Sequence, residues 1–198
     1  MKQDFLVRDS GQPFSVDKTL MSRKRWFAFC ALVLIVSNVQ AIDVQETTDF
    51  PGSSSFAFGV SVGELDPGGN TVSGTLDGVC APNDCNGAKD GDTQDSFLVT
   101  VPEGYLIESI EVTSANIGGV ITLIGFGVRS PEENIAFVNI PVNSNSGNVL
   151  TDPVPAGEYS LSVFGRLGSE AGPFTLDWSV SISIVPAVEI FQDRFDQV

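Results

Sequence analysis

The residues best suited to binding or catalysis lie in one acidic loop, N-D-C-N-G-A-K-D-G-D-T-Q-D, over residues 83–95. Calcium takes about six to eight oxygen ligands from carboxylates, amides and backbone carbonyls. The loop offers such oxygens from Asp84, Asp90, Asp92, Asp95, Asn83 and Asn86. Their spacing does not match the EF-hand pattern, which ends on a bidentate glutamate. The sequence therefore leaves two interpretations, a calcium site with Asp84, Asp90, Asp92 and Asp95 as its ligands, or a solvated acidic loop.

Two cysteines stand at the start of this loop. Cys80 and Cys85 are separated by four residues, one of them Pro82. In an oxidising compartment such an isolated pair predicts a small loop-closing disulfide. A zinc site would need two further ligands, and the sequence has no histidine and only one other cysteine, Cys30. We therefore predict a Cys80–Cys85 disulfide, with a local effect on stability because the closed loop is short.

The absence of histidine limits the catalytic chemistry that the chain could perform. It excludes Ser-His-Asp triads, Cys-His dyads and histidine-based metal centres. Two carboxylates could still hydrolyse a glycoside, although with 25 acidic residues some pair would occur by chance. Trp178 alternates with Leu176 and Val180, which favours core packing over a sugar platform. We therefore expect no enzyme, with a carboxylate-based glycoside hydrolase as a distant alternative.

The N-terminal residues 1–41 have the features of a prefix followed by a signal peptide. Three basic residues, 23–25, precede an apolar run over residues 26–36, and Val39 and Ala41 fit the −3 and −1 positions of a signal peptidase site. The alternative is a single-pass anchor, but the run is shorter than the roughly 20 apolar residues that span a bilayer. We predict translation from Met21 and cleavage after Ala41.

Removal of this segment would change the charge balance. Residues 1–41 hold six of the ten basic residues and three of the 25 acidic ones, so the remaining chain has four basic and 22 acidic residues, a net charge of −18. Nucleic acids and anionic membrane surfaces repel such a polyanion. We expect a secreted or cell-envelope protein with no nucleic-acid partner and no membrane span after cleavage.

Short alternating stretches separated by Gly, Pro and Asn predict the fold. The expected strands are 55–62, 71–76, 95–101, 106–113, 120–128, 135–142, 157–165 and 174–185. No stretch has sustained helical periodicity with caps. The pattern predicts an all-β domain over residues 55–185, an antiparallel β-sandwich or jelly roll of roughly seven to nine strands. Residues 42–54 are expected to be a linker and 186–198 a C-terminal tail.

Two of these strands also predict which side chains face the core. Phe97, Val99 and Val101 share one face of the expected strand 95–101. Tyr159, Leu161 and Val163 share one face of the expected strand 157–165, where Ser160 and Ser162 alternate with them. We expect both apolar sets to be buried.

Three motifs together resemble the bacterial pre-peptidase C-terminal domain. They are D-S-F-L-V-T-V-P-E-G at 95–104, V-P-A-G-E-Y-S-L-S-V-F-G at 154–165 and G-P-F-T-L at 172–176. The resemblance implies a β-sandwich of the kind appended to secreted proteases and other hydrolases, in which the second motif's strand pairs with the final strand. Some similar collagen-binding modules bind calcium and extracellular polymer.

The chain departs from that family in two respects. It has no Asp between Ala115 and Thr151, where the family usually has one before a short strand. The predicted signal peptide also leads almost directly into the domain, without a catalytic domain between them. Both departures weaken the expectation of a role accessory to a protease.

The tail, A-V-E-I-F-Q-D-R-F-D-Q-V, resembles the I-F-x-D-G-F-E/D endings of exported gammaproteobacterial proteins, with Arg194 in place of the glycine. It is interpreted either as a recognition tag for export or surface machinery, or as a terminal strand or frayed end.

Two functions of different classes follow. The first is a secreted, non-enzymatic β-sandwich module that binds an extracellular protein, polymer or surface and is stabilised by calcium. The second is a structural or sorting-dependent envelope protein without a ligand of its own.

Overall fold

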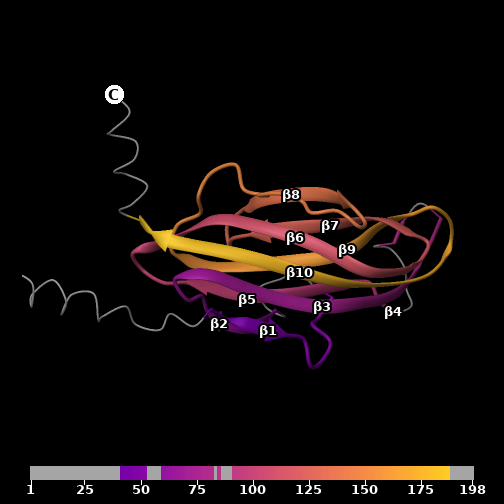
Figure 1. Ribbon diagram of the computed structural model, residues 1–198, viewed down its shortest axis with the longest axis horizontal. Helices are drawn as coiled ribbons and strands as arrows, with labels where there is room; N and C mark the ends of the chain where they lie inside the picture. The colour runs from indigo at the N-terminus through magenta and orange to yellow at the C-terminus, as the bar shows by residue number, and fades with distance from the viewer. Residues whose placement is uncertain (1–40, 53–58, 83, 86–90, 188–198) are drawn as a thin grey trace, which may run out of the picture. The chain divides into compact units, whose positions relative to one another are not determined.

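The computed structural model describes residues 41–52, 59–82, 84–85 and 91–187 (Figure 1). Within these ranges the chain forms ten strands and no long helix. They are β1 (Asp43–Gln45), β2 (Val60–Glu64), β3 (Gly68–Cys80), β4 (Gly91–Asp92), β5 (Gln94–Val101), β6 (Tyr105–Gly119), β7 (Ile121–Arg129), β8 (Asn134–Pro141), β9 (Gly157–Gly168) and β10 (Gly172–Pro186).

The strands form two five-stranded sheets that pack face to face (Figure 1). The first, here called the β3 sheet, has the order β1-β3-β10-β6, with β4 paired to β3. The second, the β9 sheet, has the order β2-β5-β9-β7-β8. The predicted all-β sandwich is therefore confirmed.

The expectation of purely antiparallel sheets is wrong at two edges. β1 runs parallel to β3, and β2 runs parallel to β5. Parallel neighbours need a crossover connection rather than a tight hairpin. Here the chain passes through the opposite sheet between each pair, since β2 separates β1 from β3 and β3 separates β2 from β5.

The segment predicted to be a linker, residues 42–54, contributes to the sandwich. Asp43 to Gln45 form β1, which pairs with Thr71 to Ser73 of β3. The side chain of Phe50 is buried, with 5% of its surface exposed. A three-residue strand is too short to give a periodic sequence signal, which explains why the pattern did not predict it.

The two strands of the later family motifs do not pair with each other, contrary to what the resemblance implies. β9 pairs with β5 and β7, whereas β10 pairs with β3 and β6. They lie in opposite sheets and meet through core side chains.

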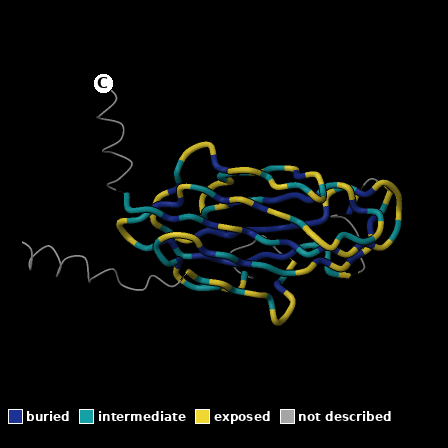
Figure 2. Tube along the Cα trace, in the orientation of Figure 1, coloured by how far each residue is buried: buried dark blue, intermediate teal, exposed yellow. Residues whose placement is uncertain are grey.

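The core lies between the two sheets (Figure 2). The predicted faces of β5 and β9 are confirmed, because Phe97, Val99, Val101, Tyr159, Leu161 and Val163 are all buried. Trp178 on β10 is also buried, as expected. The opposite faces of the same two strands are buried as well, at Ser96, Leu98, Ser160 and Ser162. Neighbouring residues cover this face, since Gln94 bonds to Ser96, Ser96 bonds to Ser162, and Gly59 packs against Leu98.

The predicted signal peptide up to residue 40 and the tail from residue 188 lie outside the described residues. In the part of the chain that the structure describes, no helix is long and apolar enough to span a bilayer.

Candidate functional site

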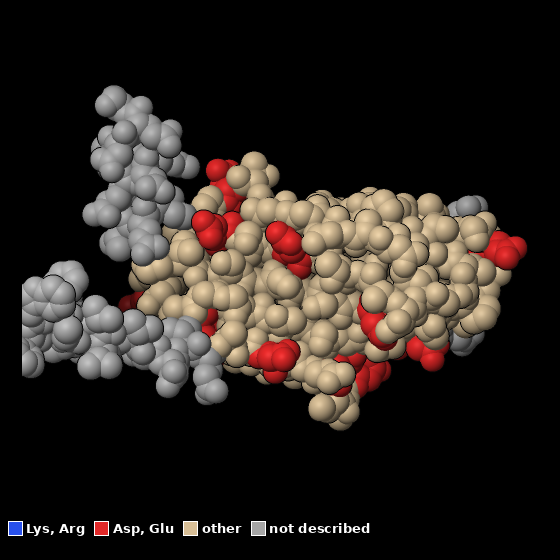
Figure 3. Space-filling view, in the orientation of Figure 1, with Lys and Arg blue, Asp and Glu red and all other residues tan. Residues whose placement is uncertain are grey.

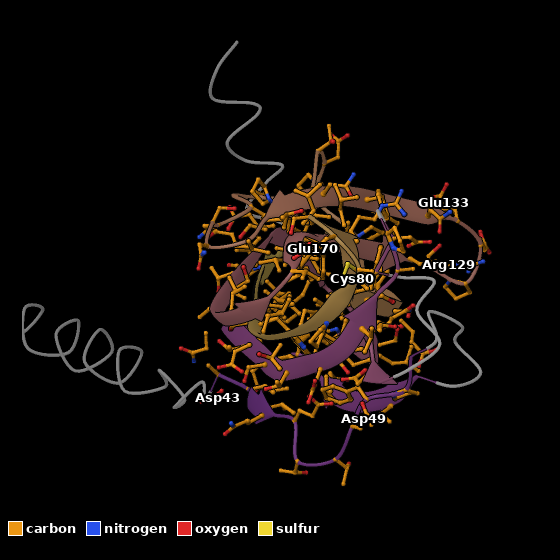
Figure 4. The ribbon with its side chains drawn as sticks, turned by 90° about the vertical axis from the view of Figure 1, so that its right-hand side faces the viewer. Asp43, Asp49, Cys80, Arg129, Glu133 and Glu170 are labelled. Carbon is orange, nitrogen blue, oxygen red and sulfur yellow. A yellow bond between two sulfur atoms is a disulfide. The ribbon has the colours of Figure 1, made fainter. Side chains whose placement is uncertain are left out.

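Carboxylates from distant parts of the sequence meet at one side of the sandwich. One oxygen each from Glu46, Asp49 and Asp95 lies within 4.8 Å of the other two. Glu46 directly follows β1, Asp49 lies three residues further on (labelled in Figure 4), and Asp95 is on β5. Asp92, at the end of β4, interacts electrostatically with this group. We call Glu46, Asp49, Asp92 and Asp95 the carboxylate cluster.

Asp95 is the deepest member of the carboxylate cluster. Its side chain has no exposed surface. Oδ2 accepts a hydrogen bond of 2.6 Å from the indole Nε1 of Trp178. Oδ1 is buried and has no hydrogen-bond partner. Native proteins rarely leave a buried polar atom unpaired, so this oxygen points to a missing partner.

Three aromatic rings pack against one another, and one of them, Trp178, contacts the carboxylate cluster through its hydrogen bond to Asp95. The rings of Phe97 and Trp178 stack in parallel, with centroids 5.8 Å apart. The ring of Phe50 is tilted against both, at 5.7 Å from Phe97 and 6.3 Å from Trp178. All three rings are buried, as is Asp95, so this carboxylate lies next to apolar groups.

Backbone groups hold Glu46 in place. Its Oε1 accepts a hydrogen bond from the amide of Phe50 at 2.5 Å, and its Oε2 accepts one from the amide of Thr75 at 3.1 Å. Gly74 of β3 is paired with Trp178, and an added Cβ there would overlap both Glu46 Oε2 and the Trp178 ring. Glycine at position 74 therefore gives the carboxylate and the indole room to approach β3.

A second glycine positions Asp92. Gly91 pairs with Gly78 and has a φ of 90°, in the left-handed region that glycine adopts at low cost. A Cβ on Gly91 would lie 2.6 Å from the carbonyl oxygen of Asp77. The close approach lets the two-residue strand β4 bring Asp92 beside the N-terminal segment.

The cluster raises the pKa of two of its members. Burial, followed by repulsion from Asp49, raises the pKa of Asp92 to about 7. Burial, followed by repulsion from Asp92 and Glu46, raises the pKa of Asp95 to about 9, and the hydrogen bond from Trp178 offsets only part of this. Among the described residues, no cationic side chain is a cause of either shift.

Only some of the predicted calcium ligands lie in the carboxylate cluster. Asp92 and Asp95 lie in the cluster. Asp84 is bridged to Ala81 and lines a separate hollow with Arg166, so it does not join them. Asp90, with Asn83 and Asn86, lies outside the described residues.

Glu46 and Asp49 were not predicted as site residues from the sequence. Both stand in D-V-Q-E-T-T-D-F, residues 43–50, an acidic stretch that ends on a large aromatic residue. That combination could have indicated a segment anchored to the fold by Phe50, but nothing local indicates that its carboxylates approach β5.

The predicted disulfide is present. Cys80 and Cys85 are bonded with an S–S distance of 2.03 Å, and both side chains are buried. The amide of Cys85 donates to the carbonyl of Arg166 on β9, at 3.4 Å. The bridge therefore fixes the start of the acidic loop to the end of β3 and beside β9.

The arrangement fits an oxygen-ligated cation. Ligands on opposite sides of a calcium ion lie about 4.6–5.2 Å apart, because each bond is about 2.3–2.6 Å long. The three oxygens within 4.8 Å of one another satisfy this spacing. A divalent cation would also supply the missing partner of Asp95 Oδ1 and offset the repulsion that raises both pKa values.

A second feature lies on the outer face of the β9 sheet. It is a hollow of about 320 Å³, lined by Gln94, Gly127, Val128, Arg129, Asn134, Ala136, Phe137, Ser160, Ser162 and Phe164. The rings of Phe137 and Phe164 are 5.8 Å apart in its wall. The hydroxyls of Ser96 and Ser162 form a hydrogen bond of 2.9 Å at the hollow, and Gln94 Nε2 donates a hydrogen bond of 3.2 Å to Ser96 Oγ. We call this the outer-face hollow.

The outer-face hollow differs in charge from the face of the molecule shown in Figure 3. In the view of Figure 3 the visible charged side chains are all Asp and Glu. The lining of the hollow contains no acidic residue and one basic residue, Arg129, which lies near Glu133 at the β7–β8 turn (Figure 4).

Comparison with known proteins gives distant structural similarities only. No family model matches the chain, and no curated protein matches it. The chain is similar to the pre-peptidase C-terminal domain of a collagenase from Bacillus anthracis, with 14% identity, a TM-score of 0.33, and coverage of 70% of this chain and 100% of that one. A family two carbohydrate esterase from Cellvibrio japonicus has 14% identity and a TM-score of 0.26, with coverage of 60% of this chain and 36% of the esterase.

Proposed function

We propose that this chain is an exported, non-enzymatic β-sandwich module in which calcium fastens the N-terminal segment to the sandwich, and which binds an extracellular partner. The observation that carries the proposal is the buried, unpartnered Oδ1 of Asp95, in a residue whose carboxylate lies within 4.8 Å of those of Glu46 and Asp49. Calcium is favoured over magnesium because the ligands come from separate segments, whereas magnesium requires a tight octahedral cage and keeps several waters.

The cation would connect parts of the chain that the sequence separates widely. Glu46 and Asp49 lie next to β1, and Asp92 and Asp95 lie on β4 and β5. β1 itself is held by a three-residue parallel pairing. A shared ion would therefore stabilise the docking of the N-terminal segment more than the central strands.

The outer-face hollow supports the partner-binding part of the proposal. Paired aromatic rings next to Arg129, Gln94 and Asn134 combine apolar contact with hydrogen-bond donors, which is the composition of many ligand sites. The absence of a carboxylate from its lining favours binding over carboxylate-based hydrolysis. A structural or sorting-dependent envelope role remains the alternative for a chain without a ligand.

Thermal unfolding tests the calcium part. We expect the melting temperature to rise with calcium, equivalent to about 2.7 kcal/mol when free calcium is a hundredfold above its dissociation constant. The same concentration of magnesium should have a much smaller effect.

The variants Glu46→Gln and Asp95→Asn, combined, should abolish this rise. The matched control combines Asp152→Asn with Glu158→Gln, which removes the same charge from two exposed positions outside the cluster. An equal rise in both double variants would show that calcium only screens net charge, and the proposed site would be wrong.

Binding is tested by capture of the purified chain on cell-wall, collagen and polysaccharide matrices, with calcium and with a chelator. We expect retention on one matrix, reduced by Arg129→Ala but not by Arg166→Ala. No retention on any matrix would favour the structural alternative, and turnover of chromogenic glycosides would favour the hydrolase.

A further inference from the structure

The sheet edges of the sandwich are protected to different degrees. An exposed edge strand presents unpaired N–H and C=O groups that can pair with another strand, and proteins usually shorten, bulge, charge or cover such edges. β1 and β4 have only three and two residues. β2 has five, with a register irregularity between Ser61 and Gly63 and a terminal Glu64.

β6 is a long strand at the edge of the β3 sheet, and a later segment of the same chain covers it. The amides of Ser146 and Val149 donate to the carbonyls of Val112 and Ile110, at 3.0 and 2.9 Å. Further along, Ile107 and Val154 exchange two hydrogen bonds, at 2.7 and 2.9 Å. The segment after β8 therefore satisfies the outward backbone groups of β6.

β8 has none of these protections along its centre. It is eight residues long, its sequence N-I-A-F-V-N-I-P contains no charge, and its pairing with β7 is regular from Ala136 to Pro141. It forms the outer edge of the β9 sheet (Figure 1). Phe137 at its middle is 55% exposed.

The register shows which backbone groups of β8 face outward. The amide of Val142 donates to the carbonyl of Thr122 at 3.1 Å, and Pro141 is opposite Leu123. Hydrogen-bonded pairs alternate along an antiparallel ladder. The N–H and C=O groups of Phe137 and Asn139 therefore point away from β7, and no described residue bonds to their N–H groups.

We propose that β8 is a dimerisation edge, at which two copies of this chain join their β9 sheets by antiparallel pairing of β8 with β8 of the partner. The inference is independent of the proposed calcium site. In the dimer the exposed ring of Phe137 would be covered, and the two outer-face hollows would lie on the same side of one continuous ten-stranded sheet.

The charge distribution favours a second copy as the occupant. Two chains of net charge −15 repel each other over most of their surfaces. β8 is an uncharged strip, so it allows close approach. Antiparallel pairing also places the acidic end of one strand, at Glu132 and Glu133, beside the uncharged Pro141 end of the other, which avoids like-charge pairs.

The expected dimer is weak. An edge of eight residues is about 27 Å long, and such a contact falls short of the roughly 800 Å² per partner of standard stable interfaces. We therefore expect a reversible equilibrium with a dissociation constant of about 1 μM to 1 mM.

Sedimentation of the purified chain over that concentration range tests the proposal. We expect the mass to rise from monomer to dimer, and the amides of Phe137 and Asn139 to exchange hydrogen more slowly at high concentration. Phe137→Lys should weaken the dimer about tenfold or more, because it places two like charges near the axis of the pair.

Two further variants keep the test specific. Val60→Lys introduces the same charge at a 48% exposed position on the opposite edge of the sheet and should leave the dimer unchanged. Asn139→Pro removes an outward N–H without removing a bond to β7, so it should preserve the fold and weaken the dimer.

Three results would overturn the proposal. They are a monomer at every concentration, equal dissociation by Phe137→Lys and Val60→Lys, or a monomer that dimerises only when residues 188–198 are deleted, which would make the tail the occupant. Loss of the calcium effect alone would leave the dimer intact, so the two proposals fail separately.

Discussion

Asp95 and Ser96 are neighbours on β5, and both are fully buried, but on opposite faces of the strand. The hydroxyl of Ser96 pairs with that of Ser162 and accepts from Gln94, so the protein satisfies it without help. The carboxylate of Asp95 receives one hydrogen bond, from Trp178, and faces other carboxylates. A neutral group can be buried with a neutral partner, whereas a buried charge requires a counter-charge or a proton.

The first prediction concerns the aromatic rings that pack next to Asp95. Phe97→Ala should lower the free energy of unfolding by about 3–5 kcal/mol, because it removes a fully buried ring that stacks on Trp178. Denaturant titration measures the change. Phe137→Ala is the matched control, since its exposed ring should contribute less than about 1 kcal/mol to the monomer.

The second prediction removes the titratable group of Asp95. Without calcium at pH 8, Asp95→Asn should raise the free energy of unfolding by about 1–3 kcal/mol. Folding then no longer has to protonate a carboxylate whose pKa rises from 3.8 to about 9, and the amide can still accept from Trp178. The same variant should lose the response to calcium. A decrease in stability without calcium would mean that Asp95 already has a counter-charge in the free protein.

The third prediction concerns pH. The folded-state pKa values of Asp92 and Asp95 are raised from 3.8 to about 7 and about 9, so between pH 4 and pH 9 the folded chain binds more protons than the unfolded chain. Its stability without calcium should therefore fall as pH rises through this range. Calcium competes with the same protons, so its stabilising effect should grow with pH.

Melting curves at pH 5, 7 and 9, with calcium and with a chelator, measure both trends. The double variant Glu46→Gln, Asp95→Asn should flatten them. A stability without calcium that increases from pH 5 to pH 9 would contradict the raised pKa values.

The fourth prediction tests the Ser96 side and has the smallest effect. Ser96→Ala should cost about 0.5–1.5 kcal/mol, since it leaves the buried hydroxyl of Ser162 without this partner. Neither calcium nor pH should change that cost. A cost that varies with calcium would mean that the two faces of β5 are coupled.

Local patterns were sufficient for most of the fold. Alternation in D-S-F-L-V-T-V and E-Y-S-L-S-V correctly predicted the buried faces of β5 and β9, and Cys80 and Cys85 were correctly paired because of their spacing. The same patterns could not show that Ser96 and Ser160 are buried too, because burial of the second face depends on which other side chains cover it.

The sequence predicted two of the four residues of the carboxylate cluster. Asp92 and Asp95 stand in an acidic loop whose composition suggests cation binding. Glu46 and Asp49 lie more than 40 residues earlier, in a stretch without strand periodicity, and Asp84 was grouped with the loop by proximity in the sequence alone. Contacts between such segments are set by the parallel pairing of β1 with β3, which has no local sequence signal.

Residue types and short-range spacing were enough to predict the all-β class, most of the longer strands, the core faces of β5 and β9, the disulfide and the acidic character. Only the packed fold shows which carboxylates meet and, among the described residues, which buried polar atoms lack a partner and which edge strand is uncovered. These properties depend on sheet order and on close approaches between distant segments, such as Glu46 against Gly74, and they exist only once the two sheets have packed.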